Sequence, residues 1–254
     1  MTFIYGLNPV RELVKHRPEQ VKEILISRKD DILEEIFELS RGIDIKVRFA
    51  SRSELDRLSG TKEHQGIIAR APLPEPVLFQ DLLEKAKENP TALIIFLDQI
   101  EDPQNLGAII RSAECLGAIG VVFPKHKSAR ITPAVAKASA GAVEWVAHSI
   151  VTNLARAIEK AKEAGFWIYG AFPQAGEKLG QVEFSAKSGI VIGSEGRGIR
   201  AGVAQHCDFQ ISIPLFGKIA SLNASVACAL ICYEYQRQIK EKSLGKGGEN
   251  EGMA

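Results

Sequence analysis

Short apolar segments alternate with amphipathic ones over the first 71 residues. A period of two predicts strands, and apolar residues at helical spacing predict helices, so we expect strands over 21–27, 45–50 and 64–71 and helices over 10–17 and 30–42. Asn8 is expected to cap the first helix and Pro9 to start it, and Gly42 is expected to close the second. Ser51 and Glu54 have the spacing of a capping box for a third, short helix. The pattern predicts a small α/β domain over residues 1–71.

The prolines of "PLPEP", residues 72–76, favour an extended chain, and we expect a linker over 72–90. A larger α/β domain is expected over 91–240. Its strands are predicted over 92–98, 119–124, 166–172, 188–194 and 209–215, and its helices over 105–118, 132–142, 152–165 and 222–240. Thr152 should cap the third of these helices and Gly165 should end it. Continuous apolar strands between helices predict a parallel sheet covered on both faces, and a disordered tail over 241–254 is expected to follow.

Composition adds limits to this picture. The chain has 254 residues and is 45% apolar, without an apolar run long enough for a membrane span or a basic-then-apolar start typical of a signal peptide. We therefore expect a cytoplasmic protein with no membrane partner. The four cysteines are scattered in apolar segments, which favours buried free thiols over a disulfide framework or a metal site. The net charge of +1 means that any nucleic acid must be bound by local basic patches.

Candidate chemistry lies where three predicted strands end, because ligands bind at the carboxyl ends of the strands in open α/β sheets. After 92–98, Asp102 and Asn105 form a turn, Gly107 permits close backbone approach, and Arg111 interrupts an otherwise apolar helix. From local pattern alone, Arg111 could equally belong to a solvated stripe. After 209–215, Ser221 can cap the last helix and Asn223 should lie just inside it.

The third strand end is the glycine-rich stretch "GIVIGSEGRGIR", residues 189–200. Gly193, Gly196 and Gly198 allow backbone N–H groups to approach a ligand, and Glu195 offers a carboxylate among them. The spacing fits neither a dinucleotide fingerprint nor a phosphate-binding P-loop, which disfavours a nicotinamide-dependent enzyme. Taken alone, the stretch could be an ordinary turn.

Together, "LDQIEDPQNLGAIIRSA", "IGSEGRGI" and "ISIPLFGKIASLNASVACAL" resemble the three motifs of the SpoU (TrmH-like) class of RNA 2′-O-ribose methyltransferases, within the SPOUT superfamily. The resemblance covers about residues 90 to 238. The first 70 residues, with "YGLNPVRELV" and "EHQGIIA", are similar to the L30e-like RNA-binding domain of the RlmB-type branch. That branch methylates a guanosine ribose in 23S ribosomal RNA. The same class acting on tRNA or another rRNA site stays an alternative, and a non-catalytic RNA-binding assembly factor is a further one.

The resemblance implies a deep trefoil knot formed by the C-terminal segment, a homodimer, and S-adenosyl-L-methionine as cofactor. It implies that the cofactor is held at Gly193, Gly198, Ile213, Leu215 and Leu222. It also implies that the reaction is carried by polar residues, namely Asn105, Arg111, Glu195, Ser221 and Asn223. No metal is implied. The partner would be 23S rRNA or the assembling large ribosomal subunit.

The resemblance implies that Arg111 acts on the ribose hydroxyl, which is barely ionised at neutral pH, either as an unusual base or by stabilising the developing alkoxide. Arg111 is expected to stabilise the developing alkoxide, because guanidinium is a poor base. Asn105 and Asn223 are expected to orient the arginine and the ribose, with Glu195 positioning the polar groups and Ser221 supporting them. Replacing Asn223 should then affect activity more than stability.

Contacts to RNA and to a second subunit are expected from local patches. For RNA we expect Lys125, Lys127, Arg130, Arg197 and Arg200 near the site, and Arg28, Lys29, Lys46 and Arg48 in the small domain, although each could be an ordinary solvated residue. The resemblance implies that the dimer interface is formed largely by the helix over 105–118 and the last helix, with the small residues Ala224, Ala227, Cys228 and Ala229 as contact surface.

Overall fold

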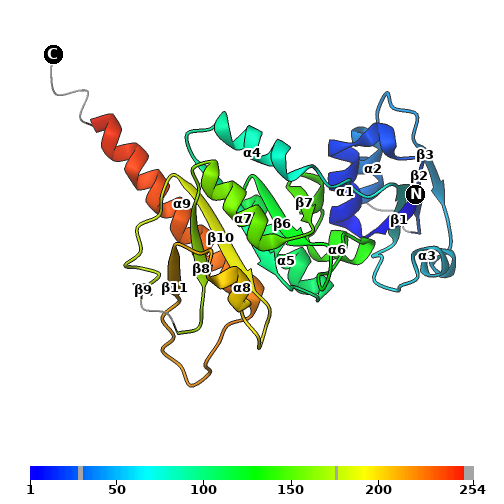
Figure 1. The fold of residues 1–254 in the computed structure, drawn as a ribbon. Helices are drawn as coiled ribbons and strands as arrows, with labels where there is room; N and C mark the ends of the chain where they lie inside the picture. The colour runs from blue at the N-terminus through cyan, green and yellow to red at the C-terminus, as the bar shows by residue number, and fades with distance from the viewer. Residues whose placement is uncertain (28–30, 175–176, 249–254) are drawn as a thin grey trace, which may run out of the picture.

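The computed structural model describes residues 1–27, 31–174 and 177–248, which form two α/β units beside each other (Figure 1). The first unit has a sheet of order β1-β4-β2-β3, in which β2 and β3 are parallel and the other pairs antiparallel. Its elements are β1 (Thr2–Tyr5), α1 (Leu7–His16), η1 (Pro18–Gln20), β2 (Glu23–Ile26), α2 (Asp31–Leu39), β3 (Lys46–Phe49), α3 (Arg52–Ser59) and β4 (Ile67–Ala71).

The second unit is built on a sheet of order β7-β6-β5-β10-β8-β11-β9, in which every pair of neighbours is parallel. It confirms the predicted α/β fold with a parallel sheet. Its elements are α4 (Phe79–Lys87), β5 (Ala92–Asp98), α5 (Pro103–Cys115), β6 (Gly120–Pro124), α6 (Pro133–Ala138), η2 (Ala142–Glu144), β7 (Ala147–Val151), α7 (Leu154–Glu163), β8 (Trp167–Ala171), β9 (Glu177–Lys178), β10 (Lys187–Gly193), α8 (Ala201–Ala204), β11 (Phe209–Ser212) and α9 (Ala224–Gly248).

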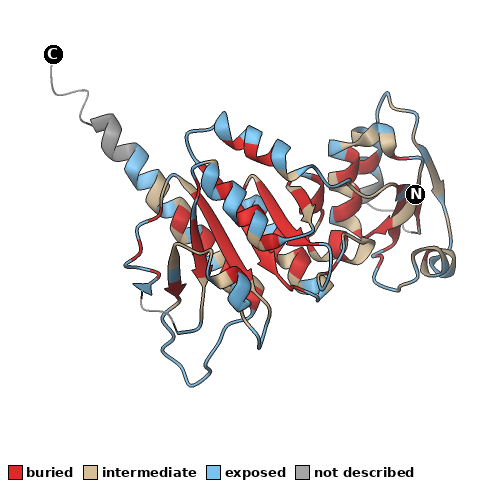
Figure 2. Ribbon diagram, viewed as in Figure 1, coloured by how far each residue is buried: buried red, intermediate tan, exposed pale blue. Residues whose placement is uncertain are grey.

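Alternation along β5 explains how the sheet is covered. All seven residues of β5 are buried, and neighbouring side chains point to opposite faces. Leu93, Ile95 and Leu97 join one apolar cluster with residues of α5 and α9, whereas Ile94 and Phe96 join a second cluster with α4 and α7. Figure 2 shows the buried residues concentrated along the strands between these helices. The central strands are therefore shielded on both faces, and their ends are the accessible parts of the sheet.

The two units share an interface. Arg17, which follows α1, forms a two-point ion pair with Glu144 of η2, with Nε–Oε2 at 2.7 Å and Nη2–Oε1 at 3.0 Å. The Glu144 side chain is only 1% exposed and that of Arg17 13%. The apolar cluster that contains Leu93 also includes Leu13 of α1 and Ile24 of β2. Buried apolar contacts and a buried ion pair thus join the small unit to the large one.

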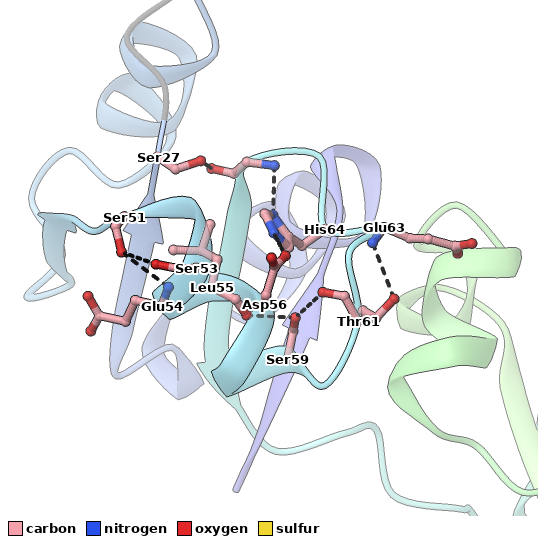
Figure 3. Close-up of polar contacts among 11 residues, drawn as sticks. Ser27, Ser51, Ser53, Glu54, Leu55, Asp56, Ser59, Thr61, Glu63 and His64 are labelled. Atoms are coloured by element: carbon pink, nitrogen blue, oxygen red, sulfur yellow. Dashed lines mark hydrogen bonds and ion pairs between the residues drawn. The ribbon is translucent and has the colours of Figure 1, made fainter.

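The loop before β4 adds a polar part to this interface (Figure 3). His64 Nδ1 accepts from the Gly66 N–H at 2.9 Å, and therefore Nε2 carries the proton donated to Asp56 Oδ1 at 2.8 Å. The fixed loop presents Gln65, whose Oε1 accepts from the Leu7 N–H at 3.1 Å and from Lys137 of α6. The "EHQG" stretch, residues 63–66, therefore connects β4 and α1 to the second unit.

Two predicted caps and one predicted linker need correction. Helix α1 begins at Leu7 after Gly6, so Asn8 lies inside the helix and does not cap it. Helix α7 is capped by Asn153, whose side chain accepts from the Arg156 N–H, and not by Thr152. Part of the stretch expected as a linker forms α4, which buries Leu82, Leu83 and Ala86 against the sheet. The Ser51 cap of α3 is confirmed.

The end of the chain also differs from expectation. Helix α9 continues to Gly248, so the prediction of a disordered tail is wrong for residues 241–248, and residues 249–254 lie outside the described part. Polar contacts hold the extension, because Arg237 pairs with Glu241 at 2.6 Å and Lys242 bonds Glu183 at 2.8 Å. The four cysteines form no disulfide, and the expectation of buried thiols holds for Cys228 and Cys232, whereas Cys207 is half-buried and Cys115 is exposed.

Candidate functional site

The three predicted motifs meet at one edge of the large sheet. Strands β5 and β10 are parallel neighbours, with Asp98 opposite Gly193 at their carboxyl ends. Strand β11 runs in the same direction, two positions from β10. The segments 98–105, 193–200 and 212–224 therefore leave the sheet side by side, at the edge where ligands bind in this class of fold.

Asn105, Glu195 and Asn223 form a hydrogen-bonded triangle that joins the three segments. Glu195 Oε1 accepts from Asn105 Nδ2 at 3.0 Å and from Asn223 Nδ2 at 2.5 Å. Asn223 Nδ2 also donates to Asn105 Oδ1 at 2.8 Å. These residues are 90 and 118 positions from Asn105 in sequence, yet their polar groups converge on a single point.

Asn223 is also the cap of α9, which corrects the prediction for Ser221. Its Oδ1 accepts from the N–H groups of Ser225 at 2.9 Å and Val226 at 3.4 Å, the pattern of an N-cap. Ser221 lies two residues earlier, in the exposed segment before the helix. Asn223 therefore uses its oxygen to start the helix and its nitrogen to complete the triangle.

The glycine-rich segment is shaped by close backbone packing. A Cβ placed on Gly193 would lie 2.2 Å from the carbonyl carbon of Gly198, so only glycine fits there. Gly196 and Gly198 have φ angles of 81° and 67°, in the left-handed region. Behind them, the buried Asp98 accepts from the Arg200 N–H at 2.8 Å and from its guanidinium at 2.6 and 2.8 Å. The turn is thereby fixed to the end of β5.

A cleft of about 550 Å³ lies between these segments, within the size range of small-molecule sites. Glu195, Ser221 and Asn223 line it, with apolar residues of β10 and β11 at its base. The five residues expected to hold a cofactor all line this cleft: Gly193, Gly198, Ile213, Leu215 and Leu222. The cleft thus combines apolar walls, glycines that allow backbone approach, and a polar group at one end.

A second, smaller hollow of about 270 Å³ lies on the other side of the triangle. It shares Ser194 and Glu195 with the cleft and is further lined by Gln99, Ile100, Glu101, Asp102, Asn105 and Arg197. Asp102 is engaged as the cap of α5, since its carboxylate accepts from the N–H groups of Gln104 and Asn105. Two spaces therefore meet at the triangle, one largely apolar and one polar.

Arg111 is exposed on α5 and makes no hydrogen bond or ion pair within the described part of the chain. The subunit thus does not bring it into contact with the triangle. Its position on α5 nevertheless leaves the guanidinium accessible at the surface.

The predicted basic residues divide into free and engaged ones. Lys125, Lys127 and Arg130 are exposed just after β6, at the same edge of the sheet as the site, and Arg130 Nη2 donates to the Lys125 carbonyl oxygen at 2.9 Å. Arg200 is bound to Asp98 and is therefore a structural residue. In the small unit, Arg48 pairs with Glu54 at 2.9 Å, Lys46 is exposed, and Arg28 and Lys29 lie outside the described residues.

The last helix shows an outward apolar stripe that the sequence analysis missed. Val226, Leu230 and Tyr233 are 45%, 41% and 61% exposed and recur at helical spacing. Ala224 and Cys228, which we expected at a subunit contact, are instead buried in the protein's own core. The spacing of the three larger residues was the signal that could have identified this surface.

Within residues 1–27, 31–174 and 177–248, no group of His, Cys, Asp and Glu side chains is arranged to hold a metal ion. The same residues include no helix long and apolar enough to span a membrane.

Comparisons with known proteins agree with this site. Residues 92–233 match the model of the SpoU rRNA methylase family, and residues 3–77 match that of an RNA 2′-O ribose methyltransferase substrate-binding domain. The chain is 37% identical over 245 residues to the 23S rRNA (guanosine-2′-O-)-methyltransferase RlmB of Pseudomonas putida, covering 93% of this chain and 97% of that protein. It is 40% identical over 206 residues to a putative TrmH family tRNA/rRNA methyltransferase of Bacillus subtilis, covering 81% of this chain and 82% of that protein.

Solved structures support the fold. The SpoU methyltransferase AviRb from Streptomyces viridochromogenes, solved in complex with AdoMet, has a TM-score of 0.77 at 24% identity, covering 93% of this chain and 89% of that one. The three motifs at one sheet edge, the family model over most of the larger unit and the relatives that span almost the whole chain lead to one conclusion. The chain belongs to the SpoU rRNA methylase family.

Proposed function

We propose that the protein methylates the 2′-hydroxyl of a guanosine ribose in 23S rRNA, with S-adenosyl-L-methionine as methyl donor. The observation that carries this proposal is the triangle of Asn105, Glu195 and Asn223 at the boundary between the cleft and the polar hollow. The near full-length similarity to proteins named as 23S rRNA guanosine-2′-O-methyltransferases supports the choice of substrate.

The cleft has the features that the donor requires. Its apolar walls from Ile213, Leu215 and Leu222 suit the adenine and ribose, and the glycine turn lets main-chain groups approach polar atoms. When bound, the donor supplies an electrophilic methyl group on a sulfonium. The residues around it have to exclude water and align the incoming hydroxyl.

The triangle can align the ribose. Glu195 restricts both amide groups, because its Oε1 accepts from each of them. Asn105 and Asn223 are then held at the side where a ribose would approach the cleft. Arg111 supplies positive charge toward the developing alkoxide, since a guanidinium remains protonated and acts electrostatically. Ser221 supports the ribose from the cleft wall.

Finer features complete the proposal. We assign residues 1–71 to an L30e-like RNA-binding domain, and α4 together with residues 91–240 to a methyltransferase domain whose C-terminal segment forms a trefoil knot. The exposed Lys125, Lys127 and Arg130 near the site bind RNA phosphates. The protein acts in the cytoplasm on 23S rRNA or the assembling large subunit.

Methyl transfer to mapped RNA tests the proposal. Unmodified 23S rRNA, 16S rRNA and tRNA are incubated with the protein and methyl-labelled S-adenosyl-L-methionine, and the labelled nucleotide is mapped. Label on one guanosine ribose of 23S rRNA is expected. Label on tRNA or 16S rRNA would mean that this RNA, and not 23S rRNA, is the substrate. If the protein binds the cofactor but labels none of the RNAs, it would be a binding protein and not a methyltransferase.

Arg111→Ala should reduce methyl transfer to the detection limit, because the charge facing the alkoxide is lost. The affinity for S-adenosyl-L-methionine, measured by calorimetry, should stay within about threefold of the wild-type value, since Arg111 does not line the cleft. Unchanged turnover would remove Arg111 from the mechanism.

We also propose a homodimer formed by α5 and the stripe Val226, Leu230 and Tyr233 of α9. A contiguous apolar stripe on an exposed helix is typical of a protein contact. Leu230→Glu places a charge in this contact and should shift the mass measured by light scattering from dimer to monomer. A dimer that persists, or a wild-type monomer, would contradict this surface.

A further inference from the structure

The polar hollow next to the triangle lies where the target nucleoside has to bind. Glu195 and Ser194 line both the cleft and the hollow, and Asn105 lines the hollow. If the cofactor occupies the cleft, the ribose hydroxyl must approach the triangle from the other side. The base attached to that ribose then lies in or over the hollow. This step rests on the proposed function.

Two charged side chains of opposite sign line this hollow without pairing. Glu101 and Arg197 are both exposed, and neither forms an ion pair or hydrogen bond with any residue in the described ranges. The nearby ionic groups are engaged, since Asp102 caps α5 and Arg200 bonds Asp98. A carboxylate and a guanidinium are therefore both available to a ligand in the same space.

A guanine base matches this pair of charges. Its N1–H and 2-amino groups are neighbouring donors that a carboxylate can accept together, and its O6 and N7 are acceptors for a guanidinium. Adenine has an amino group in place of O6 and no donor at N1, so it would leave the carboxylate without its paired donors and the guanidinium with N7 alone. We infer that Glu101 and Arg197 recognise the guanine base of the target nucleotide, which makes them specificity-determining residues.

The experiment uses three short RNAs that differ only at the target base. They carry guanosine, inosine or adenosine at the nucleotide mapped in 23S rRNA, and single-turnover methylation gives a rate per unit enzyme concentration for each. The full-length wild-type protein is compared with Glu101→Gln and Arg197→Ala. Glu88→Gln and Arg156→Ala, at exposed positions outside both spaces, serve as matched controls.

In both site variants the methylation rate on guanosine RNA should fall about 5- to 150-fold, whereas the rate on adenosine RNA should change little. The preference for guanosine should therefore be lost. Inosine lacks the 2-amino group but keeps N1–H, so the wild-type protein should lose activity on it, and Glu101→Gln should reduce the rate less on inosine RNA than on guanosine RNA. Affinity for S-adenosyl-L-methionine should be unchanged in both variants.

Equal losses on all three RNAs would show a contact that is indifferent to the base and would overturn the inference. Unchanged rates on guanosine RNA would also overturn it. These outcomes differ from failure of the proposed function itself, in which the wild-type protein methylates none of the RNAs.

Discussion

Asn223 performs two tasks with the two ends of one amide. Its oxygen caps α9, and its nitrogen bonds Asn105 and Glu195. From the sequence, replacing Asn223 was expected to reduce activity more than stability. Because the residue is also a cap, removing both ends should affect both properties, and substitutions can separate them.

Asn223→Ser keeps an oxygen that can cap the helix but removes the amide donor. The rate of methyl transfer should fall about 10- to 100-fold, while the free energy of unfolding changes by less than about 0.5 kcal/mol. Asn223→Ala should lose a similar rate and about 1 kcal/mol of stability. Denaturant unfolding and methylation assays measure the two effects, with Asn153→Ser at the cap of α7 as control. A normal rate in Asn223→Ser would exclude the amide from the reaction.

At the scale of elements, the contact between β10 and its following turn decides the shape of the cleft. The backbones of Gly193 and Gly198 approach closely, and the Ser194 and Gly198 backbones form a bridge. The groups that a Cβ on Gly193 would meet are main-chain atoms, so they cannot rotate away as a flexible side chain could. The turn can only shift as a whole.

Gly193→Ala should therefore displace the 194–198 turn and weaken binding of S-adenosyl-L-methionine at least about tenfold, a loss of about 1.4 kcal/mol. Calorimetry measures the affinity directly. Gly202→Ala is the matched control, because a Cβ there meets no atom within 4 Å. Equal affinities for the two variants would mean that the turn does not shape the cofactor site.

Elements with a strong hydrophobic pattern were predicted from the sequence, and elements with a weak pattern were missed. Strands β5 and β10 are continuous apolar runs, and both were predicted. Strand β7 was missed because it contains His148 and Ser149, which are polar yet buried. Strand β1 was missed although it is as long as β2 and β3, which were predicted. Helix α4 was not predicted, because the prolines of residues 72–76 before it favoured an extended linker.

The convergence of the three motifs could be predicted from the parallel strands, but the contacts within the site could not. Parallel strands bring their carboxyl ends together, which is why the three motifs were expected to converge. The bonds among Asn105, Glu195 and Asn223 depend on tertiary placement, and so does the difference between Arg197, which is free, and Arg200, which is bound to Asp98. No local pattern distinguishes the two arginines.

At the scale of the whole molecule, β7 carries a buried histidine at the edge of the large sheet. His148 is 3% exposed, stacks on Phe123, and its backbone accepts from the Val77 N–H beyond the proline-rich stretch. Burial lowers the pKa of His148 to about 4, because the charged form is poorly solvated there. The folded protein thus keeps this ring neutral.

The unfolded chain binds a proton at the ordinary histidine pKa of about 6.5, so between pH 6.5 and 4 it holds more protons than the folded state. The contribution of His148 to the free energy of unfolding should be constant above pH 6.5. It should fall by about 3 kcal/mol as the pH drops from 6.5 to 4. His148→Phe should remove that part of the slope in unfolding experiments. The exposed His126→Ala should leave it in place, and identical slopes for wild type and His148→Phe would refute the assignment.

The ion pair between Arg17 and Glu144 has a consequence for how such a protein can change over evolutionary time. The partners lie in different units, 127 positions apart, and both are largely shielded from water. Losing either one alone leaves an uncompensated charge at a cost of about 3–5 kcal/mol, comparable to much of a domain's net stability. Recombination that exchanged only the smaller unit would have to bring a matching cation for Glu144. The two units are therefore expected to be inherited together, and a new RNA target is more readily reached by substitution than by domain exchange.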